Sequence, residues 1–594
     1  MTRLCGSGLV FAACFKRASV LEKRSVSISH PSRDSCRSTF RRFIPVFQSI
    51  RRTTVLLASQ AVVAAFTPTI ASAEFVLSTA TTSNIQSAFS SGTLTCSGLT
   101  QLYLNRIEAY DKQGPAINSI IATNPNALSI AAELDAAYAQ SGPVGPLHCV
   151  PVVLKDNFDT VDMPTTGGAL ALEGFFTGSD AFQVQKLREA GALILAKSNL
   201  SEFAFGFTSD SSLGGLTLNP YDTTRNSGGS SGGTGAAIAA NFGVIGFGTD
   251  TGGSIRVPSS FNSLVGLRPT IGLTSRSGII PLALTQDVGG PMARTVADVA
   301  AALSVVAGFD PKDPVTEGSI GKVPEDYTEF LDKDGLKGAK IGVDRALFGS
   351  PTNPESAKTT AVIDAAIAEL EALGAEVVDI TIPNLAEILS FPSFSTFEFK
   401  RDLNAYLAER PVPPSGVRDL EDIIESGLFL ESQRNAYITR NNVTPPEENA
   451  QYQQFLAERP VITQASLLQA LTGLDAIVYP SVASPPNVIG QGLASGSANR
   501  LSPFSGFPAL SVPAGFTEDG LPVGLEFLGR AYDEGTLLKL AYAFEQGTQF
   551  RRDPLTTPPL PGETVRAIPE PSTVGAIALA GMGLIGSRRK RQQG

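Results

Sequence analysis

Histidine, tryptophan, methionine and cysteine are scarce in this chain. Its 594 residues include two histidines, four methionines, five cysteines and no tryptophan. Histidine-rich metal centres and Ser-His-Asp triads both depend on histidine. A metal site built on several histidines is therefore excluded, and a triad has only His148 as its base once the N-terminal region is set aside. We expect neither a metal nor a cofactor.

Positive charge is scarce outside the two ends of the chain. The whole chain has a formal net charge of −10. Residues 1–73 carry 11 Lys or Arg and two acidic residues, a net charge of +9, and the last 26 residues carry four basic residues and one acidic residue, a net charge of +3. The rest of the chain, called the body here, therefore has a net charge of −22. A body with this much negative charge binds nucleic acids and anionic membranes poorly. We therefore expect no nucleic-acid partner; nothing in the sequence indicates the oligomeric state.

Residues 1–73 have the plan of a secretory signal peptide. Arg51-Arg52 precedes an apolar run from Val55 to Phe66, and the small residues Ala71-Ser72-Ala73 follow. This order predicts cleavage by a signal peptidase after Ala73, and hence export to the periplasm, the cell surface or the medium. A membrane anchor is the alternative, although the apolar run is shorter than the ~20 residues that a span needs.

The last residues of the chain, 566–594, form a second candidate sorting signal. Pro569-Glu570-Pro571 is followed by an apolar stretch from Val574 to Gly586 and then by the basic run Arg588 to Arg591. This order resembles the PEP-CTERM sorting signal of bacteria that make exopolysaccharide, and the resemblance implies an exosortase as processing partner. A frayed tail without function is the alternative.

Two cysteines remain after removal of the predicted signal. Cys5, Cys14 and Cys36 lie within it, whereas Cys96 and Cys149 belong to the body. In an exported protein they could form a disulfide that closes a loop of about 50 residues, worth roughly 4 kcal/mol in the chain-entropy model. Two free buried thiols are the equally weighted alternative.

The body, residues 74–565, has the pattern of an α/β protein. Thr95 is a candidate N-cap of a helix, and the apolar run from Val150 to Leu154 predicts a buried strand that ends directly before Lys155. Strands at 340–343 and 376–382, with a helix at 356–373 between them, predict a βαβ unit and a largely parallel sheet. Residues 395–465 predict a helical cover, within which the hexapeptide at 407–412 recurs at 456–461 and suggests two similar helix ends.

A stretch dense in glycine and serine, 226–235, is the most unusual feature. It leads into an Ala-rich helix, an apolar strand at 243–247 and the loop Asp250-Thr-Gly-Gly-Ser-Ile-Arg256. A phosphate-binding loop would need Gly-Lys-Ser/Thr, which is absent. The match of 228–232 to the nucleophile elbow of α/β-hydrolases fails because no histidine follows Ser230. Ser319-x-x-Lys322 matches the penicillin-binding motif, but no Lys-Thr-Gly follows, so we treat that match as chance.

The remaining hypothesis is a serine nucleophile without histidine. Its base would then be a lysine, whose pKa burial must lower from ~10.4. Lys155 fits this role because it ends a buried apolar strand. The glycines of the segment 251–254 allow backbone N–H groups to converge on one point, as an oxyanion hole requires.

At these residues the chain resembles the amidase signature family, over about residues 78–552. The resemblance identifies Lys155 as the base, Ser230 as the serine held by a cis peptide bond, and Ser254 as the nucleophile. It implies a large mixed, mostly parallel sheet covered by helices on both faces. The further roles that it implies are oxyanion donors at Thr251, Gly252, Gly253 and Ser254, orientation of Lys155 by Ser231, and bracing of the loop by Asp250 and Arg256.

The function that the resemblance implies is an exported amidase. It would hydrolyse a small-molecule or peptide amide to an acid and an amine through an acyl-enzyme, most simply as an enzyme of class EC 3.5.1.4. Two alternatives stay open: the glutaminase subunit of a tRNA-dependent amidotransferase, which belongs to the same family, and a surface-anchored binding protein without turnover.

Overall fold

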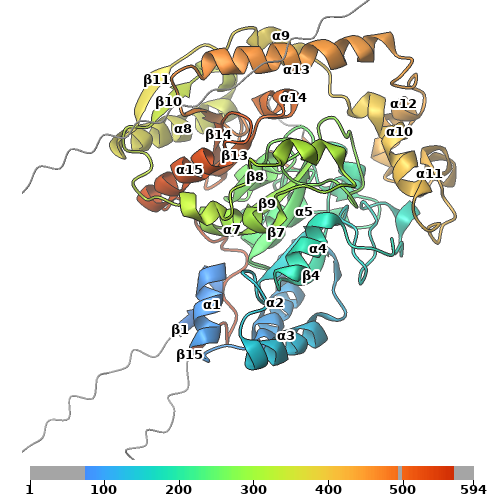
Figure 1. Ribbon diagram of the computed structural model, residues 1–594, viewed down its shortest axis with the longest axis vertical. Coiled ribbons are helices and arrows are strands. Elements are labelled where there is room, and N and C mark those ends of the chain that lie inside the picture. Colours follow the sequence, from blue (N-terminus) through green and yellow to red (C-terminus); the bar gives the residue numbers. More distant parts are fainter. Residues whose placement is uncertain (1–73, 492–497, 567–594) are drawn as a thin grey trace, which may run out of the picture. The chain divides into compact units, whose positions relative to one another are not determined.

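An 11-stranded mixed sheet forms the centre of the structure (Figure 1). The computed structural model describes residues 74–491 and 498–566, so the predictions for 1–73 and 567–594 lie outside the described residues. The order across the sheet is β11 (Glu376–Asp379), β10 (Lys340–Val343), β12 (Ala476–Pro480), β14 (Pro522–Leu528), β13 (Ala509–Phe516), β8 (Val265–Arg268), β9 (Val288–Ala293), β7 (Ile245–Asp250), β3 (Pro151–Lys155), β4 (Leu193–Ser198) and β2 (Ile120–Thr123).

Parallel pairing occurs in two blocks of this sheet. β10 is parallel to β11 and β12, and β3 is parallel to β4 and β7, whereas the six other pairings are antiparallel. The α/β class, the mixed sheet and the βαβ unit of β10 and β11 are confirmed. Parallel pairing is less extensive than expected because the neighbouring strands β8 and β9, and likewise β13 and β14, pair directly with one another as antiparallel neighbours.

Helices lie over both faces of the sheet (Figure 1). α5 contacts α6 and the strands β3 and β7, while α7 contacts α4, α15 and β9. Apolar side chains of these helices and strands form two large buried clusters. The helices of the described chain outside the helical segment treated next are α1 (Thr82–Ser90), α2 (Cys96–Tyr110), α3 (Ala127–Ser141), α4 (Phe182–Glu189), α5 (Gly232–Ala239), α6 (Arg256–Phe261), α7 (Val296–Val306), α8 (Pro354–Ala372), α9 (Leu385–Ser390), α14 (Leu501–Ser505) and α15 (Glu534–Thr548).

The segment expected to be a helical cover consists of four helices. They are α10 (Ser395–Ala408), α11 (Leu420–Ser426), α12 (Arg434–Asn441) and α13 (Ala450–Ala470). Apolar side chains of α10, α11 and α12 pack against those of the loop residues 169–175, 203–205 and 280–282 rather than on a face of the sheet. The helical prediction is therefore confirmed, but the three shorter helices cover loops that surround the candidate site.

The two ends of the described chain meet in a small ribbon. β1 (Glu74–Val76) pairs antiparallel with β15 (Thr564–Arg566). A second short ribbon consists of β5 (Asp210–Ser211) and β6 (Gly215–Leu216). Among the described residues, no helix combines the length and the hydropathy that crossing a membrane would require.

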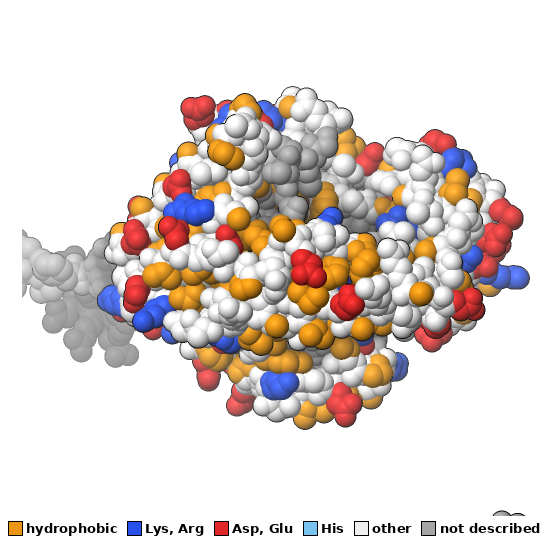
Figure 2. All heavy atoms as spheres, turned by 90° about the horizontal axis from the view of Figure 1, so that it is seen from above, with side chains coloured by type: hydrophobic (Ala, Val, Ile, Leu, Met, Phe, Trp, Pro, Cys, Tyr) orange, Lys and Arg blue, Asp and Glu red, His pale blue; other side chains and the backbone are white. Residues whose placement is uncertain are grey.

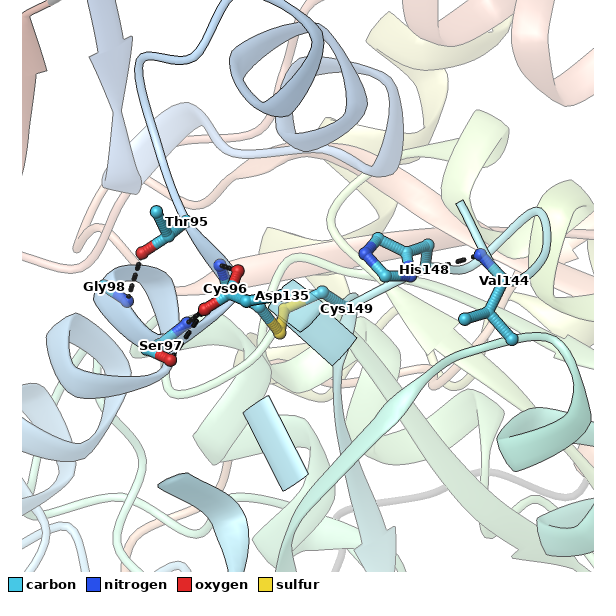
Figure 3. The surroundings of a disulfide bond; sticks show 8 residues. All are labelled: Thr95, Cys96, Ser97, Gly98, Asp135, Val144, His148 and Cys149. Carbon is cyan, nitrogen blue, oxygen red and sulfur yellow. Dashed lines mark hydrogen bonds between the residues drawn. A yellow bond between two sulfur atoms is a disulfide. The ribbon is translucent and has the colours of Figure 1, made fainter. Parts of the chain in front are cut away.

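A disulfide joins Cys96 to Cys149 (Figure 3). The Cα atoms of the two cysteines lie 5.7 Å apart. Cys96 begins α2, where Thr95 caps the helix by accepting a hydrogen bond from the N–H of Gly98, as predicted. Cys149 lies two residues before β3, so the disulfide links the start of α2 to the strand that ends at Lys155. His148 beside it is 2% exposed and packs against Phe89 and Tyr138.

One face of the molecule shows how charge is distributed at the surface. In Figure 2, hydrophobic side chains gather across the middle of this face, while acidic and basic side chains are interspersed around its edge. On this face, then, positive charge does not gather into a single patch.

Candidate active site

Lys155 lies at the buried end of β3. Its side chain is fully buried, and its Nζ donates hydrogen bonds of 2.7 Å to Ser230 Oγ and 2.7 Å to Thr249 Oγ1. Burial lowers the pKa of Lys155 to about 7, against the opposing influence of the Asp250 and Asp287 carboxylates. A lysine with this pKa is largely neutral at slightly alkaline pH and can accept a proton.

Ser230 is held by the Gly-Ser segment directly before α5. The Gly229–Ser230 peptide bond is cis. The Ser230 carbonyl accepts hydrogen bonds from the Ser201 N–H (3.1 Å) and the Ser209 hydroxyl (3.3 Å). The following turn needs glycine because a Cβ at Gly233 would lie 2.1 Å from the carbonyl oxygen of Asn199. These contacts place the Ser230 hydroxyl against Lys155.

Ser254 lies in the loop between β7 and α6. It is 5% exposed, and its carbonyl accepts a hydrogen bond from the Ser231 N–H at 3.2 Å. The structure thus brings the Ser254 loop and the Ser230 loop into direct contact. Ser231 itself bonds through its hydroxyl to the backbone N–H and carbonyl of Thr249, at 3.3 and 3.2 Å. Ser231 therefore reaches Lys155 through Thr249 and not directly, and the expected orientation of Lys155 by Ser231 stays a prediction.

The predicted oxyanion donors differ in whether their N–H groups already form a hydrogen bond within the protein. The Gly253 N–H donates to Asp250 Oδ1 at 2.7 Å, so it is committed within the loop. Within residues 74–491 and 498–566, the N–H groups of Thr251, Gly252 and Ser254 form no hydrogen bond. These three groups, and not Gly253, are the donors that the loop leaves for a ligand.

Asp250 and Arg256 brace the loop from inside the protein. Asp250 accepts from the Ile255 N–H (3.1 Å) and from Arg256 Nε (3.0 Å), and both side chains are fully buried. Burial alone would raise the pKa of Asp250, but the charges of Arg256 and Arg268 lower it below the usual range. The carboxylate therefore stays charged and can hold the loop over the whole physiological pH range.

The network around Asp250 extends across the sheet. Arg256 also donates to Glu526 Oε1 on β14 at 2.5 Å and to the Asn499 carbonyl at 2.8 Å. Arg268 on β8 donates to the Gln286 carbonyl at 2.9 Å and bonds both the carbonyl and the carboxylate of Asp250. Buried charges are tolerated when they are paired and hydrogen-bonded, as they are here.

A pocket of about 200 Å³ opens beside the loop 250–256. Thr251, Gly252 and Ser254 line one side of it. Gln286 lines it as well: its Nε2 donates to the Thr251 carbonyl at 2.7 Å, and its Oε1 accepts from the Phe394 N–H at 2.7 Å. The amide of Gln286 therefore connects the loop to the start of α10. The pocket is lined on one side by loop residues that follow β7 and precede β9, and on another by Ser393 and Ser395 at the start of α10.

Sequence reasoning missed Thr249, Asn157, Gln286, Arg268 and Glu526. Thr249 accepts hydrogen bonds from both Lys155 Nζ and Asn157 Nδ2, the latter at 3.1 Å. Its position next to Asp250 at the end of an apolar run was a usable signal for a site residue. Gln286, Arg268 and Glu526 belong to separate strands or loops, and only the folded sheet brings them to the loop 250–256, where they bond to Thr251, Asp250 and Arg256 respectively.

Comparisons with known proteins agree with this geometry. The family model "Amidase" matches residues 98–538, and a model of the PEP-CTERM protein-sorting motif matches residues 567–592. A glutamyl-tRNA(Gln) amidotransferase subunit of Carboxydothermus hydrogenoformans is 37% identical over 465 residues, or 75% of this chain and 93% of that protein. A probable amidase of Arabidopsis thaliana is 35% identical over 508 residues, or 81% of this chain and 93% of that protein.

A solved structure of similar fold is the native peptide amidase of Stenotrophomonas maltophilia. It has a TM-score of 0.74 and 37% identity, and the match covers 80% of this chain and 98% of that chain. The same enzyme type has also been solved with the competitive inhibitor chymostatin, at a TM-score of 0.72. This chain therefore shares most of its fold with enzymes that act on amides.

Proposed function

The chain belongs to the amidase family, and from that premise we propose that it hydrolyses a carboxylic or peptide amide to an acid and an amine. One observation carries the proposal: the Nζ of the fully buried Lys155 lies 2.7 Å from Ser230 Oγ. A lysine with a pKa of about 7 supplies the base that a site without histidine needs. The simplest class for the reaction is that of linear-amide hydrolases.

In the proposed reaction, Ser254 is the nucleophile. Neutral Lys155 takes a proton from Ser230, which takes one from Ser254, while Ser254 Oγ forms a bond to the amide carbon. The N–H groups of Thr251, Gly252 and Ser254 stabilise the oxyanion. Lys155 returns the proton through Ser230 to the leaving nitrogen as the C–N bond breaks. Water then attacks the ester carbon, the acid leaves, and Ser254 regains its proton.

Replacement of Ser254 tests this assignment. Ser254→Ala should lower kcat by at least about 10⁴-fold on any amide that the protein hydrolyses, because the acyl-enzyme can no longer form. A serine-directed sulfonyl reagent should label Ser254, as mapped by peptide mass spectrometry. Ser231→Ala is the matched control, since it removes a neighbouring buried hydroxyl that does not react. Labelling on Ser230, or full activity of Ser254→Ala, would overturn the assignment.

A glutaminase subunit of an amidotransferase is the second candidate. The identity to such a protein in Carboxydothermus hydrogenoformans favours it, whereas the sorting motif at 567–592 favours an exported amidase. The isolated chain acting on a panel of primary amides distinguishes them, because an amidotransferase subunit would release ammonia chiefly from glutamine and only with its partners. Release of no amine from any amide would instead favour a binding protein without turnover.

The sorting motif also supports a proposal about the ends of the chain. We propose that residues 1–73 are a signal removed by signal peptidase, that 74–565 are the amidase domain, and that 566–594 are a tail processed by an exosortase. Export would place the enzyme in the periplasm, at the cell surface or in the medium. An exported location is also compatible with the Cys96–Cys149 disulfide, because disulfides persist in oxidising compartments.

A further inference from the structure

Among the described residues that line the pocket beside Ser254, Arg500 is the charged one. Arg500 lies where the short helix Ala498–Arg500 meets α14. Its Nη1 donates to the carbonyls of Leu389 (2.7 Å) and Phe391 (3.2 Å). A guanidinium group has five N–H donors in a planar fork, so these two bonds hold Arg500 while other donors stay available to a ligand.

Two further arginines donate hydrogen bonds to polar side chains that line this pocket. Arg459 Nη1 donates to Gln286 Oε1 at 3.0 Å, and Arg440 Nη2 donates to Ser395 Oγ at 3.5 Å. Gln286 and Ser395 both line the pocket. Burial lowers the pKa of Arg459 to about 9 and that of Arg440 to about 10. Arg459 lies over the rings of Phe394 and Phe504, and Arg440 lies over the ring of Phe205, so aromatic faces rather than carboxylates surround these cations.

Carboxylates do not neutralise this cluster. Within the part of the chain that the structure describes, Arg440, Arg459 and Arg500 form no ion pair. The nearest acidic influence on Arg459 is Glu398, whose carboxylate is already bonded to Thr285 and Tyr452. Poorly compensated buried cations are costly, and an anionic ligand would reduce that cost.

We propose that this pocket binds a carboxylate carried by the acyl part of the substrate, with Arg500 as the specificity-determining residue that contacts it. Arg440 and Arg459 add positive potential through Ser395 and Gln286. The proposal rests on the amidase function proposed above. A pocket of about 200 Å³ is smaller than the ~300–1,000 Å³ of sites for drug-sized ligands. The group that fills it is therefore about the size of one amino-acid side chain.

Matched peptide amides test the proposal. Ala-Glu-NH2 and Ala-Gln-NH2 differ only in the group at the end of the side chain, which is a carboxylate in one and a neutral amide in the other. Hydrolysis of either amide of Ala-Gln-NH2 gives products of equal mass, so fragment ions in tandem mass spectrometry identify cleavage at the terminal amide. We expect kcat/KM to be at least about 10-fold higher for the Glu substrate, mainly through a lower KM, and the preference should decrease with added salt. Arg500→Met should lower kcat/KM for the Glu substrate at least 10-fold more than for the Gln substrate, and Arg500→Lys should restore part of the preference.

Arg530→Met is the matched control. Arg530 is also half-buried and also donates to two backbone carbonyls, those of Leu471 and Leu474, but it lies outside the pocket. This variant should keep the Glu preference. Equal kcat/KM for the two substrates, or a Glu preference that Arg500→Met leaves intact, would overturn the proposal.

Binding separates this proposal from the function on which it rests. If no amide is hydrolysed, the amidase proposal fails. Calorimetry of ligand binding to the Ser254→Ala variant then tests whether the pocket binds a carboxylate. Glutarate should bind this variant at least 10-fold more tightly than its neutral analogue glutaramide, and Arg500→Met in the same background should remove the difference. Equal binding of the two compounds would overturn the anion site independently of turnover.

Discussion

Lys155 illustrates at the scale of single residues how burial creates reactivity. An ammonium group in a site closed to solvent loses hydration, and its only hydrogen-bond partners among the described residues are the hydroxyls of Ser230 and Thr249. Neither hydroxyl carries a charge that could compensate it. The Asp250 carboxylate is nearby, but it is paired with Arg256 and Arg268. Desolvation therefore outweighs the attraction to acids, and the pKa of Lys155 is about 7.

The pH dependence of activity should report this lysine. Because the reaction needs neutral Lys155, we expect kcat/KM to rise with pH through an apparent pKa of about 7 and to level off above about pH 8. Below the midpoint it should fall about 10-fold per pH unit. Initial rates between pH 5 and 9 on one neutral amide measure the profile.

Asp287→Asn is the control variant for this profile. Burial raises the pKa of Asp287 to about 6, so this carboxyl could itself produce a limb in the acidic range. If the limb belongs to Lys155, Asp287→Asn should move it to lower pH, because the variant removes a negative charge that raises the pKa of Lys155. Loss of the limb in Asp287→Asn would assign it to Asp287 and contradict the role of Lys155.

A candidate residue could be predicted from the sequence where a reactive side chain stands in a recognisable local pattern. Lys155 was identifiable because a charged residue directly follows an apolar strand, whereas Ser230 and Ser254 were identified by their resemblance to the motifs of the amidase signature family. The hydrogen-bond partners of Ser231 and Gly253 could not be predicted from the sequence, because they depend on which hydrogen bonds form after folding. Ser231 bonds to Thr249 instead of Lys155, and the Gly253 N–H bonds to Asp250.

At the scale of elements, the recurrent hexapeptide shows how tertiary context decides a helix end. Leu-Ala-Glu-Arg-Pro-Val at 407–412 ends α10 at Ala408, as expected. The same residues at 456–461 lie inside α13, which continues through Pro460 to Ala470. The prediction of two similar helix ends is therefore wrong for the second copy. Its arginine, Arg459, bonds to Gln286 and the Pro392 carbonyl, contacts that the first copy does not form.

Local patterns located individual elements better than their pairing. The predicted strand 340–343 is β10 as observed, and the predicted helix 356–373 corresponds to α8. The direction of pairing in the middle of the sheet was not predictable from a single βαβ unit. It depends on β8, β9, β13 and β14, which come from distant parts of the chain and meet only in the folded sheet.

The buried network that joins β7, β8, α6 and β14 should be essential for stability. Arg268→Met would leave Asp250 with one arginine fewer and would remove donors to Ser502 and Gln286. Breaking a buried ion pair from one side costs on the order of 3–5 kcal/mol. We expect a loss of this size in urea unfolding followed by circular dichroism.

An exposed arginine provides the comparison for Arg268. Arg345 also bonds two carboxylates, those of Asp364 and Asp379, but its side chain is 48% exposed. Arg345→Met should cost less than about 1 kcal/mol, because exposed ion pairs contribute little. Equal losses in the two variants would show that burial of the network does not determine its contribution.

At the scale of the whole molecule, the last described segment is bound to the first. The Leu77 N–H donates to the Glu563 carbonyl at 3.0 Å, next to the β1–β15 ribbon. Arg106 on α2 donates to the Glu563 carboxylate at 2.9 Å and to the Pro558 carbonyl at 3.1 Å. Both side chains of the ion pair are nearly inaccessible, at 3% and 4%. The described chain is thus closed by contacts that end at Arg566, directly before the sorting motif at 567–592.

Truncation of the tail should therefore leave stability almost unchanged, whereas a point variant at Glu563 should lower it. Removal of residues 567–594 leaves every described contact of the segment 551–566 in place, so the free energy of unfolding should change by less than about 0.5 kcal/mol. Glu563→Gln should cost on the order of 3 kcal/mol, because it leaves Arg106 buried without its carboxylate. Urea unfolding of the two variants beside the full chain measures both values. A large loss on truncation would mean that the tail belongs to the folded body, whereas the expected result means that a sorting enzyme can remove it without weakening the enzyme.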